Sequence, residues 1–254
     1  MQLVFHIKLL MSHSQHLKGG FMSDLLDTQI EEIVSSSIGF KLNRAEFVRG
    51  LQFASEFVSK DKSRPILCGV NLTVKKIDGD WALRLTATDS YKMGGYFLKV
   101  SNPLNMDMVT DCERSSEYLL KGEDVKSLLT ILKKDRIYLN EIAVFIHERK
   151  VIFSTVDSDL ITVVNLEDGE FPNVEQFIPN ESDFAIKKDD LPNGICLGSD
   201  HLQKSVNAFK KIKVAEIIFR FQAELKPIFI SPRSRDDFEI EYPFAILMPV
   251  RFSS

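Results

Sequence analysis

The segment PFAILMPVRF (residues 243–252) is apolar apart from one arginine, and it lies two residues before the last residue of the sequence. Chain ends usually fray into water unless other structure holds them. An end that keeps this many apolar side chains together is expected either to be held in a sheet or to bind an apolar partner. We expect the segment to form the edge strand of the structural unit that precedes it.

The composition of the whole chain is that of a folded globular protein. Of 254 residues, 44% are hydrophobic and 27% are charged, which is enough to bury one large core or two modest ones. The net charge of -4 argues against a protein that coats nucleic acid over its whole surface, but it allows local basic clusters. No apolar run approaches the roughly 20 residues that a bilayer span needs, so we expect no membrane association.

The sequence shows no pattern that would support catalysis or a bound metal. Cys68, Cys112 and Cys196 lie at wide, unrelated spacings, which fits reduced buried thiols of a cytoplasmic protein better than a disulfide framework or a metal site. The sequence contains no glycine-rich phosphate loop, nucleophile elbow or zinc-protease motif. We therefore predict a non-catalytic, cytoplasmic protein without cofactor or metal.

Three weak copies of one pattern, a strand followed by a helix and three strands, recur at intervals of roughly 75 residues. The first begins with an extended run at residues 38–42, and Asn43 is the expected N-cap of its helix. The Asp78-Gly79 pair marks a hairpin between two of its later strands. The apolar helix stripe and the three strand-like runs are Phe47, Leu51, Ala54, Phe57 and Val58, followed by residues 69–74, 81–88 and 94–100.

The second and third copies repeat this order. The second starts at residues 117–120, and its strands fill residues 136–166; the third starts at residues 195–198, with Ser199 or Asp200 as the expected N-cap. The pattern predicts an α+β fold of repeated half-units with antiparallel sheets, and the alternative is an α+β domain whose segments are similar by accident. The expected inward helix positions are Val125, Leu128, Leu129 and Leu132 in the second copy and Leu202, Val206, Phe209 and Ile212 in the third.

Basic residues gather on or beside the three expected helices, whereas acidic residues dominate the loops. A surface lined by such helices would attract DNA phosphates without reading bases. Lysines at the helix C-terminal ends could equally serve only to complement the helix dipole. The predicted DNA-binding residues are Arg44, Arg49, Arg64, Lys121, Lys126, Lys133, Lys204 and Lys210.

Several separated segments resemble, in order and spacing, segments of bacterial sliding clamps, the beta subunit of DNA polymerase III. They are SRPILCGVNLTV (63–74) with LTATDSYKM (85–93), DGEFPNVEQFIP (168–179), and ELKPIFISP (224–232) with FAILMPVRF (244–252). The resemblance covers residues 38–252, identifies the chain as similar to a shortened or divergent clamp, and implies the DNA-clamp fold.

In that family these motifs surround an apolar cleft between two domains, which captures short peptide motifs of polymerases and repair proteins. Leu67, Ile246 and Phe177 could equally be ordinary core residues. Tyr91 and Lys92 replace the usual His and Arg, and Gln176 stands where a basic residue is frequent, so partner preference can differ. The resemblance implies a cleft made of Leu67, Thr88, Ser90, Tyr91, Lys92, Met93, Pro172, Gln176, Phe177, Ile246, Met248, Pro249, Val250 and Arg251.

The resemblance also implies a domain plan and a function. Residues 38–179 correspond to one complete clamp-like domain, similar to the middle domain, and residues 180–254 to a truncated C-terminal one; residues 1–37 are expected to be a leader that can be disordered and carries a short helix. A clamp ring is built from more domains than this, which leaves ring closure open.

The implied function is that of a homo-oligomeric replication processivity factor that binds double-stranded DNA non-specifically. Its expected partners are a DNA polymerase, other clamp-binding proteins and, where loading is needed, a clamp loader. The alternative is a peptide-binding module or decoy that sequesters clamp partners without encircling DNA.

Overall fold

The computed structural model describes residues 36–106, 109, 117–133, 140–155, 160–179, 184, 195–223, 225–234, 236, 238 and 241–250. The expected leader (residues 1–37) lies outside this part of the chain apart from its last two residues, and so do Cys112 and Arg251. Across the described ranges, no helix is long and apolar enough to span a membrane.

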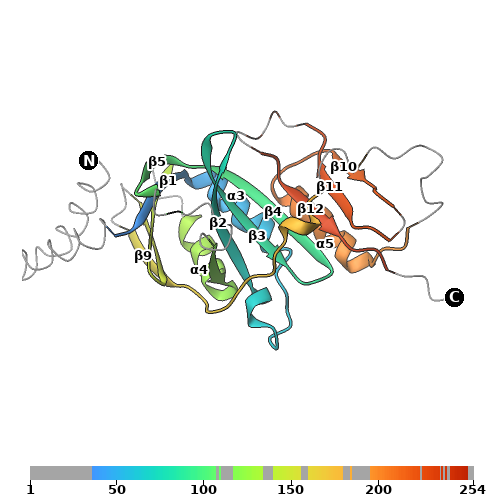
Figure 1. Cartoon of the computed structure of the whole chain (residues 1–254), viewed down its shortest axis with the longest axis horizontal. Coiled ribbons are helices and arrows are strands. Elements are labelled where there is room, and N and C mark those ends of the chain that lie inside the picture. The colour runs from blue at the N-terminus through green and yellow to red at the C-terminus, as the bar shows by residue number, and fades with distance from the viewer. Residues whose placement is uncertain are drawn as a thin grey trace, which may run out of the picture.

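Figure 1 shows the described strands and helices, coloured in chain order. They are β1 (Ile38–Asn43), α3 (Arg44–Ala54), η1 (Pro65–Cys68), β2 (Gly69–Ile77), β3 (Asp80–Thr88), β4 (Lys92–Lys99), β5 (Ser101–Leu104), β6 (Glu117–Lys121), α4 (Gly122–Leu132), β7 (Glu141–His147), β8 (Lys150–Thr155), β9 (Leu160–Asn165), η3 (Glu175–Phe177), α5 (Ser199–Lys211), β10 (Ile217–Arg220), β11 (Ile228–Pro232) and β12 (Phe244–Leu247).

Two antiparallel sheets organise these strands. One has five strands in the order β5-β1-β7-β8-β9, and the other has seven in the order β10-β11-β12-β4-β3-β2-β6. The seven-stranded sheet contains strands from all three of the predicted copies, so the copies share one sheet rather than each forming its own.

Helix α3 lies at the centre of the main core, because its aromatic residues contact both sheets and a second helix. The Phe47 ring stacks on that of Phe153 in β8 at 5.5 Å between centroids. The Phe53 ring lies 6.0 Å from that of Tyr96 in β4 and 5.1 Å from that of Phe209 in α5. Aromatic pairs at these separations contribute beyond their buried area, so α3 joins the two sheets and α5 into one core.

Two local signals in the sequence are confirmed. Asp78 and Gly79 both have positive φ (51° and 93°) between β2 and β3, as a two-residue hairpin turn requires. The Asn43 side chain accepts a hydrogen bond from the Glu46 backbone N–H at 3.1 Å and caps α3.

The third copy departs from the sequence prediction at its start. Residues 195–198 are not part of a sheet ladder, and the N-cap of α5 is Gly198, which offers no side-chain hydrogen bond. Val206, predicted to face inward, is 37% exposed, whereas Ser205 and Ala208 are buried. The inward stripe of α5 is thus shifted by about one residue at this turn, since a helix brings residues three apart as well as four apart onto one face.

The C-terminal segment forms a strand at the edge of its own copy's three strands β10, β11 and β12, as expected, but this edge pairs with β4 of the first copy and so lies inside the larger sheet. β12 covers only residues 244–247 and pairs with β11 on one side and β4 on the other (Figure 1). Ala245 and Leu247 point into the main core, while Phe244 and Ile246 face the opposite side of the sheet. A strand that is apolar on both faces belongs inside a sheet that is covered on both sides.

Candidate functional site

The pairing of β4 with β12 brings two of the three predicted cleft segments together. Met93 lies opposite Ile246, and Lys92 lies opposite Leu247. Beyond the end of β12, the Met248 N–H donates to the Tyr91 carbonyl oxygen at 2.9 Å. Residues 88–93 and 246–248 therefore form one continuous backbone surface.

Side-chain hydrogen bonds fix the turn that precedes β4. Asp89 accepts from the backbone N–H groups of Tyr91 and Lys92, both at 3.0 Å. The Thr88 hydroxyl donates to the Lys92 carbonyl at 2.9 Å and accepts from the Ser90 N–H at 3.2 Å. Ser90 has a φ of 79°, a left-handed conformation that a non-glycine residue adopts only when its surroundings hold it there. The turn is thus fixed before any ligand binds.

Lys92 is the most unusual residue of the predicted cleft because it is only 2% exposed. Its Nζ lies 3.0 Å from Asp89 Oδ2, donates to the Glu56 carbonyl at 2.7 Å, and stands 5.2 Å from the centroid of the Phe57 ring. Burial lowers the pKa of the Lys92 ammonium, against the opposing effect of the Asp89 carboxylate. Lys92 therefore supports the turn from inside.

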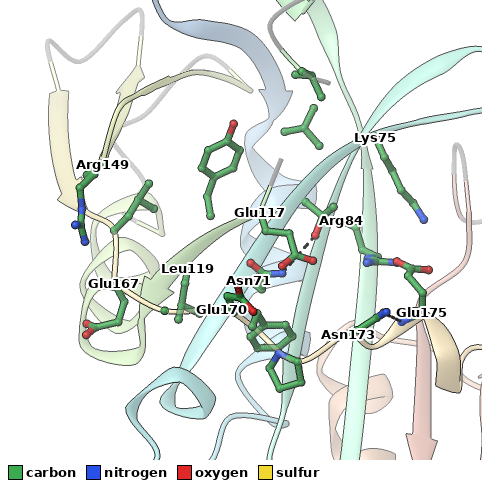
Figure 2. A pocket seen from close by; sticks show the side chains of 18 of the residues that line it. Asn71, Lys75, Arg84, Glu117, Leu119, Arg149, Glu167, Glu170, Asn173 and Glu175 are labelled. Atoms are coloured by element: carbon green, nitrogen blue, oxygen red, sulfur yellow. Dashed lines mark hydrogen bonds and ion pairs between the residues drawn. The ribbon is translucent and has the colours of Figure 1, made fainter. Parts of the chain in front are cut away.

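The third predicted segment packs on the same side of the sheet. Phe171 and Val174 join Met93 and Ile246 in a second apolar cluster, the outer cluster, on the sheet face opposite the main core. The η3 turn follows, and its Glu175 forms an ion pair with Arg84 of β3 (Figure 2). The full membership of the outer cluster is Met93, Leu119, Phe171, Val174, Phe229, Phe244 and Ile246.

The predicted cleft residues divide into a buried base and an exposed surface. Three large apolar side chains, Tyr91, Phe177 and Val250, are 58%, 42% and 49% exposed. Met248 and Pro249 are partly buried, and Ser90, Pro172 and Gln176 are exposed. The buried members are Leu67, Thr88, Lys92, Met93 and Ile246, and Arg251 lies outside the described residues.

Several predicted DNA-binding residues are engaged within the chain. Arg44 Nη1 donates to the Leu132 carbonyl at 2.7 Å, which ties α3 to α4. Arg49 pairs with Glu46 at 2.6 Å and donates to the Ile212 carbonyl at 2.9 Å, which ties α3 to the end of α5.

Arg64 and Lys121 also have partners within the chain. Arg64 donates to Ser90 Oγ at 3.0 Å and pairs with Asp61, so it lies next to the cleft turn rather than on a helix. Lys121 pairs with Glu167 at 3.0 Å, and this contact raises the pKa of its ammonium. Of the remaining predicted residues, Lys126, Lys133 and Lys210 are exposed, and Lys204 is partly buried.

The structure adds a residue that sequence reasoning missed. The His201 ring in the first turn of α5 lies 5.2 Å from the Tyr91 ring, and its Nδ1 is 3.7 Å from Asp89 Oδ2. His201 therefore joins α5 to the turn of the first copy. No local sequence pattern pairs a histidine of the third copy with a turn of the first, so this contact could be identified only from the structure.

Comparisons with known proteins find sequence similarity to beta sliding clamps. The sequence is similar to the beta sliding clamp of Lactococcus lactis subsp. lactis (strain IL1403), at 27% identity over 129 residues, or 51% of this chain and 30% of the relative. It is also similar to the beta sliding clamp of Rickettsia bellii (strain RML369-C), at 26% identity over 149 residues, or 59% of this chain and 36% of the relative. No protein-family model matches.

Solved structures share the fold at low sequence identity. The sliding clamp of Bartonella birtlesii bound to griselimycin matches with a TM-score of 0.62 at 16% identity, covering 85% of this chain and 66% of the other. The beta subunit of DNA polymerase III from Thermotoga maritima matches with a TM-score of 0.61 at 18% identity, over 85% and 66%. A clamp of C. crescentus with polyethylene glycol bound to its proposed beta-motif tethering region matches with a TM-score of 0.63 at 12% identity, over 84% and 65%.

The fold is therefore that of the DNA sliding clamps, an α+β fold with antiparallel sheets. In particular, the chain resembles the bacterial beta sliding clamp, so the predicted resemblance and fold class are confirmed. The matched region spans about a third of the curated relatives and about two thirds of the solved structures.

Proposed function

We propose that the chain is a non-catalytic, sliding-clamp-like processivity factor of DNA replication that captures short peptide motifs of a DNA polymerase and other clamp-binding proteins. One observation carries the proposal. The β4–β12 pairing and the outer cluster bring three segments, distant in the sequence and similar to clamp segments, into contact with one another. The similarity to beta sliding clamps makes this reading more favourable than a decoy that never encircles DNA.

The proposed peptide site has a rigid base and an apolar surface. Met93 and Ile246 are fixed in the sheet, and Tyr91, Phe177 and Val250 of the same three segments present exposed apolar area. An extended peptide gains most of its affinity by burying one or two apolar anchors in such a preformed site. Each anchor contributes about 2 to 3 kcal/mol, so micromolar binding requires several contacts together.

A matched pair of valines tests the peptide site. The probe is a fluorescein-labelled peptide that carries the clamp-binding motif of a bacterial polymerase, and its affinity is measured by fluorescence anisotropy. Val250→Asp should lower this affinity by about tenfold or more, because the variant places a charge against the apolar anchors. Val163→Asp is the control: Val163 is 55% exposed, like Val250 at 49%, but it lies in β9 of the other sheet. Unchanged affinity of Val250→Asp, or equal losses in both variants, would remove the site assignment.

For DNA, we propose that the exposed lysines on the helices contact the phosphate backbone of double-stranded DNA. Lys126, Lys133 and Lys210 are exposed, whereas Arg44 and Arg49 hold the helices together. Each phosphate contact contributes about 0.9 to the slope of log affinity against log salt concentration. These residues would bind DNA regardless of its base sequence.

Charge reversal of two of these lysines tests the DNA proposal, and a second double variant serves as its control. Lys126→Glu combined with Lys210→Glu should lower affinity for duplex DNA uniformly across sequences and make the salt slope shallower by about 2. Lys150→Glu combined with Lys226→Glu makes the same change in net charge at two exposed positions away from the three helices. Equal losses in both double variants would show that only net charge matters.

The oligomeric state tests the proposed ring. Size-exclusion chromatography with light scattering should show an oligomer of defined size, and the protein should stay on circular DNA but leave it when the DNA is linearised. A strict monomer at high concentration, with intact peptide binding, would instead favour the decoy function. Whether loading needs a separate clamp loader follows from repeating the circular-DNA assay with and without a bacterial loader.

A further inference from the structure

A cavity of about 870 Å³ lies on the outer side of the seven-stranded sheet, away from the predicted DNA-binding helices. Strands β2, β3 and β6 contribute part of its lining, and residues 166–173 with Glu175 run along it (Figure 2). Of the predicted cleft residues, only Pro172 contributes to its lining. The cavity therefore adjoins the proposed peptide site but is lined mostly by other residues, and its volume is in the usual range for small-molecule sites.

The sheet surface beneath this cavity is polar although it is buried. Asn71 lies opposite Thr86, and Thr73 lies opposite Arg84, in the β2–β3 ladder. Because side chains alternate along a strand, all four point to the same face, opposite the Leu72 side chain of the main core. Asn71, Thr73, Arg84 and Thr86 are 1%, 5%, 1% and 0% exposed.

Two of these residues that line the cavity carry buried polar atoms without a hydrogen-bond partner among the described residues. Arg84 forms its ion pair with Glu175 through Nη1, but its Nε–H has no acceptor. Asn71 donates from Nδ2 to Thr73 Oγ1 at 3.4 Å, but its Oδ1 has no donor. Buried polar atoms nearly always have partners, so one unused donor and one unused acceptor on diagonal positions point to a ligand.

The charges around the cavity disfavour an anionic ligand. Glu175 already neutralises the Arg84 guanidinium, so the unused Nε–H does not by itself demand an anion. Beside the polar floor, Leu119 and Phe171 provide buried apolar surface and Pro172 extends it. Around the cavity the carboxylates Glu117, Glu148, Glu167, Asp168, Glu170 and Glu175 outnumber the cations Lys75, Lys76, Arg84 and Arg149.

We propose that this cavity binds a neutral amide that carries an apolar substituent. The amide oxygen accepts from Arg84 Nε–H, the amide N–H donates to Asn71 Oδ1, and the apolar group packs against Leu119 and Phe171. The amide can belong to a free small molecule or to the backbone of a peptide, because both present the same donor and acceptor. The inference does not depend on the proposed replication function.

The test is an NMR titration of the full chain in which the Arg84 Nε–H resonance is followed. 4-Methylpentanamide is the probe, and 4-methylpentanoate, which replaces its single amide by a carboxylate on the same skeleton, is its charged counterpart. A ligand of this size is expected to bind in the millimolar range, so both are titrated to about 20 mM. We expect a saturable shift with the amide and at least tenfold weaker binding of the carboxylate.

Variants locate the binding. Asn71→Leu removes the acceptor with a side chain of similar size and should lower the affinity for the amide at least tenfold. Asn165→Leu, the same substitution at an exposed position of β9, should leave the affinity unchanged. A shift that does not saturate, equal binding of the carboxylate, or equal effects of the two variants would overturn the proposal. The wild-type titrations decide it even if Asn71→Leu fails to fold.

A third probe separates the two sources of the amide. N-acetyl-Leu-Ala-Ala-amide binds more tightly than 4-methylpentanamide if the cavity admits a peptide chain, and no more tightly if it takes a free small molecule.

Discussion

The Lys92–Asp89 pair predicts an asymmetry between two single substitutions. Lys92 is almost fully buried and its charge is held by Asp89 at 3.0 Å, the Glu56 carbonyl at 2.7 Å and the Phe57 ring. Removing one partner of a buried ion pair leaves the other charge uncompensated and costs about 3 to 5 kcal/mol. The two substitutions should differ in their cost to stability, because the residue that each leaves without its ion-pair partner keeps different other contacts.

Asp89→Asn should be the more destabilising change. Asparagine can still accept the two backbone hydrogen bonds of the turn, so the substitution removes the negative charge and little else. The buried ammonium then retains one carbonyl and one aromatic ring, which places the expected cost at the lower end of the range, about 3 kcal/mol.

Lys92→Met should cost less, about 1 to 2 kcal/mol, since methionine keeps the apolar stem and leaves one carbonyl unpaired. Asp89 keeps its two N–H donors in that variant and is 12% exposed. Urea unfolding followed by the fluorescence of Trp81, the single tryptophan, measures both changes. The exposed pair Lys99–Asp80 at 3.6 Å is the control, and Lys99→Met and Asp80→Asn should each change stability by less than about 1 kcal/mol. A Lys92→Met variant as unstable as Asp89→Asn would refute the reasoning.

Three further predictions concern pH, the sheet and a helix cap. Burial lowers the pKa of Lys92 below its ordinary 10.5, so between the lowered pKa and 10.5 the unfolded chain binds more protons than the folded chain. The free energy of unfolding should therefore rise with pH across that window. Urea titrations at several pH values should show this rise in the wild type, and Lys92→Met should lack it. Gly95→Ala should destabilise by about 2 kcal/mol or more in the same assay, because the added Cβ would stand 2.4 Å from the Phe244 ring at the β4–β12 pairing, and a variant as stable as wild type would contradict that packing. Asn43→Ala should cost about 1 kcal/mol in thermal unfolding by removing the cap on the Glu46 N–H, and no change would mean that water replaces the cap.

Local signals predicted the elements well because they depend on neighbouring residues. Asp78-Gly79 specified its turn through backbone conformation, and Asn43 specified a helix start through one hydrogen bond. Val206 was misassigned because residues three and four apart share a helix face, and packing in the folded chain decides between them.

The sequence predicted which segments form the site, but not how these segments lie relative to one another. The pairing of Ile246 with Met93 is non-local, and no rule of local propensity distinguishes an interior strand from an edge strand as short as β12. Lys92 was placed in the cleft by the resemblance to clamp motifs, yet its four-carbon stem lets the ammonium reach the Glu56 carbonyl inside the fold. The cavity beside Arg84 was missed because Asn71, Thr73, Arg84 and Thr86 come together only through the strand register.

The interior position of β12 has a consequence for how the chain folds. β12 leaves the ribosome long after β4, yet the sheet is not complete until β12 lies between β4 and β11. Until then β4 presents an open edge that carries Met93 and Tyr96, and open apolar edges readily pair with other chains. Closing a sheet from segments so far apart in the sequence is slow, because the entropy of loop closure is lost before the contacts form. During synthesis, the nascent chain must therefore keep β4 from pairing wrongly until β12 has been made.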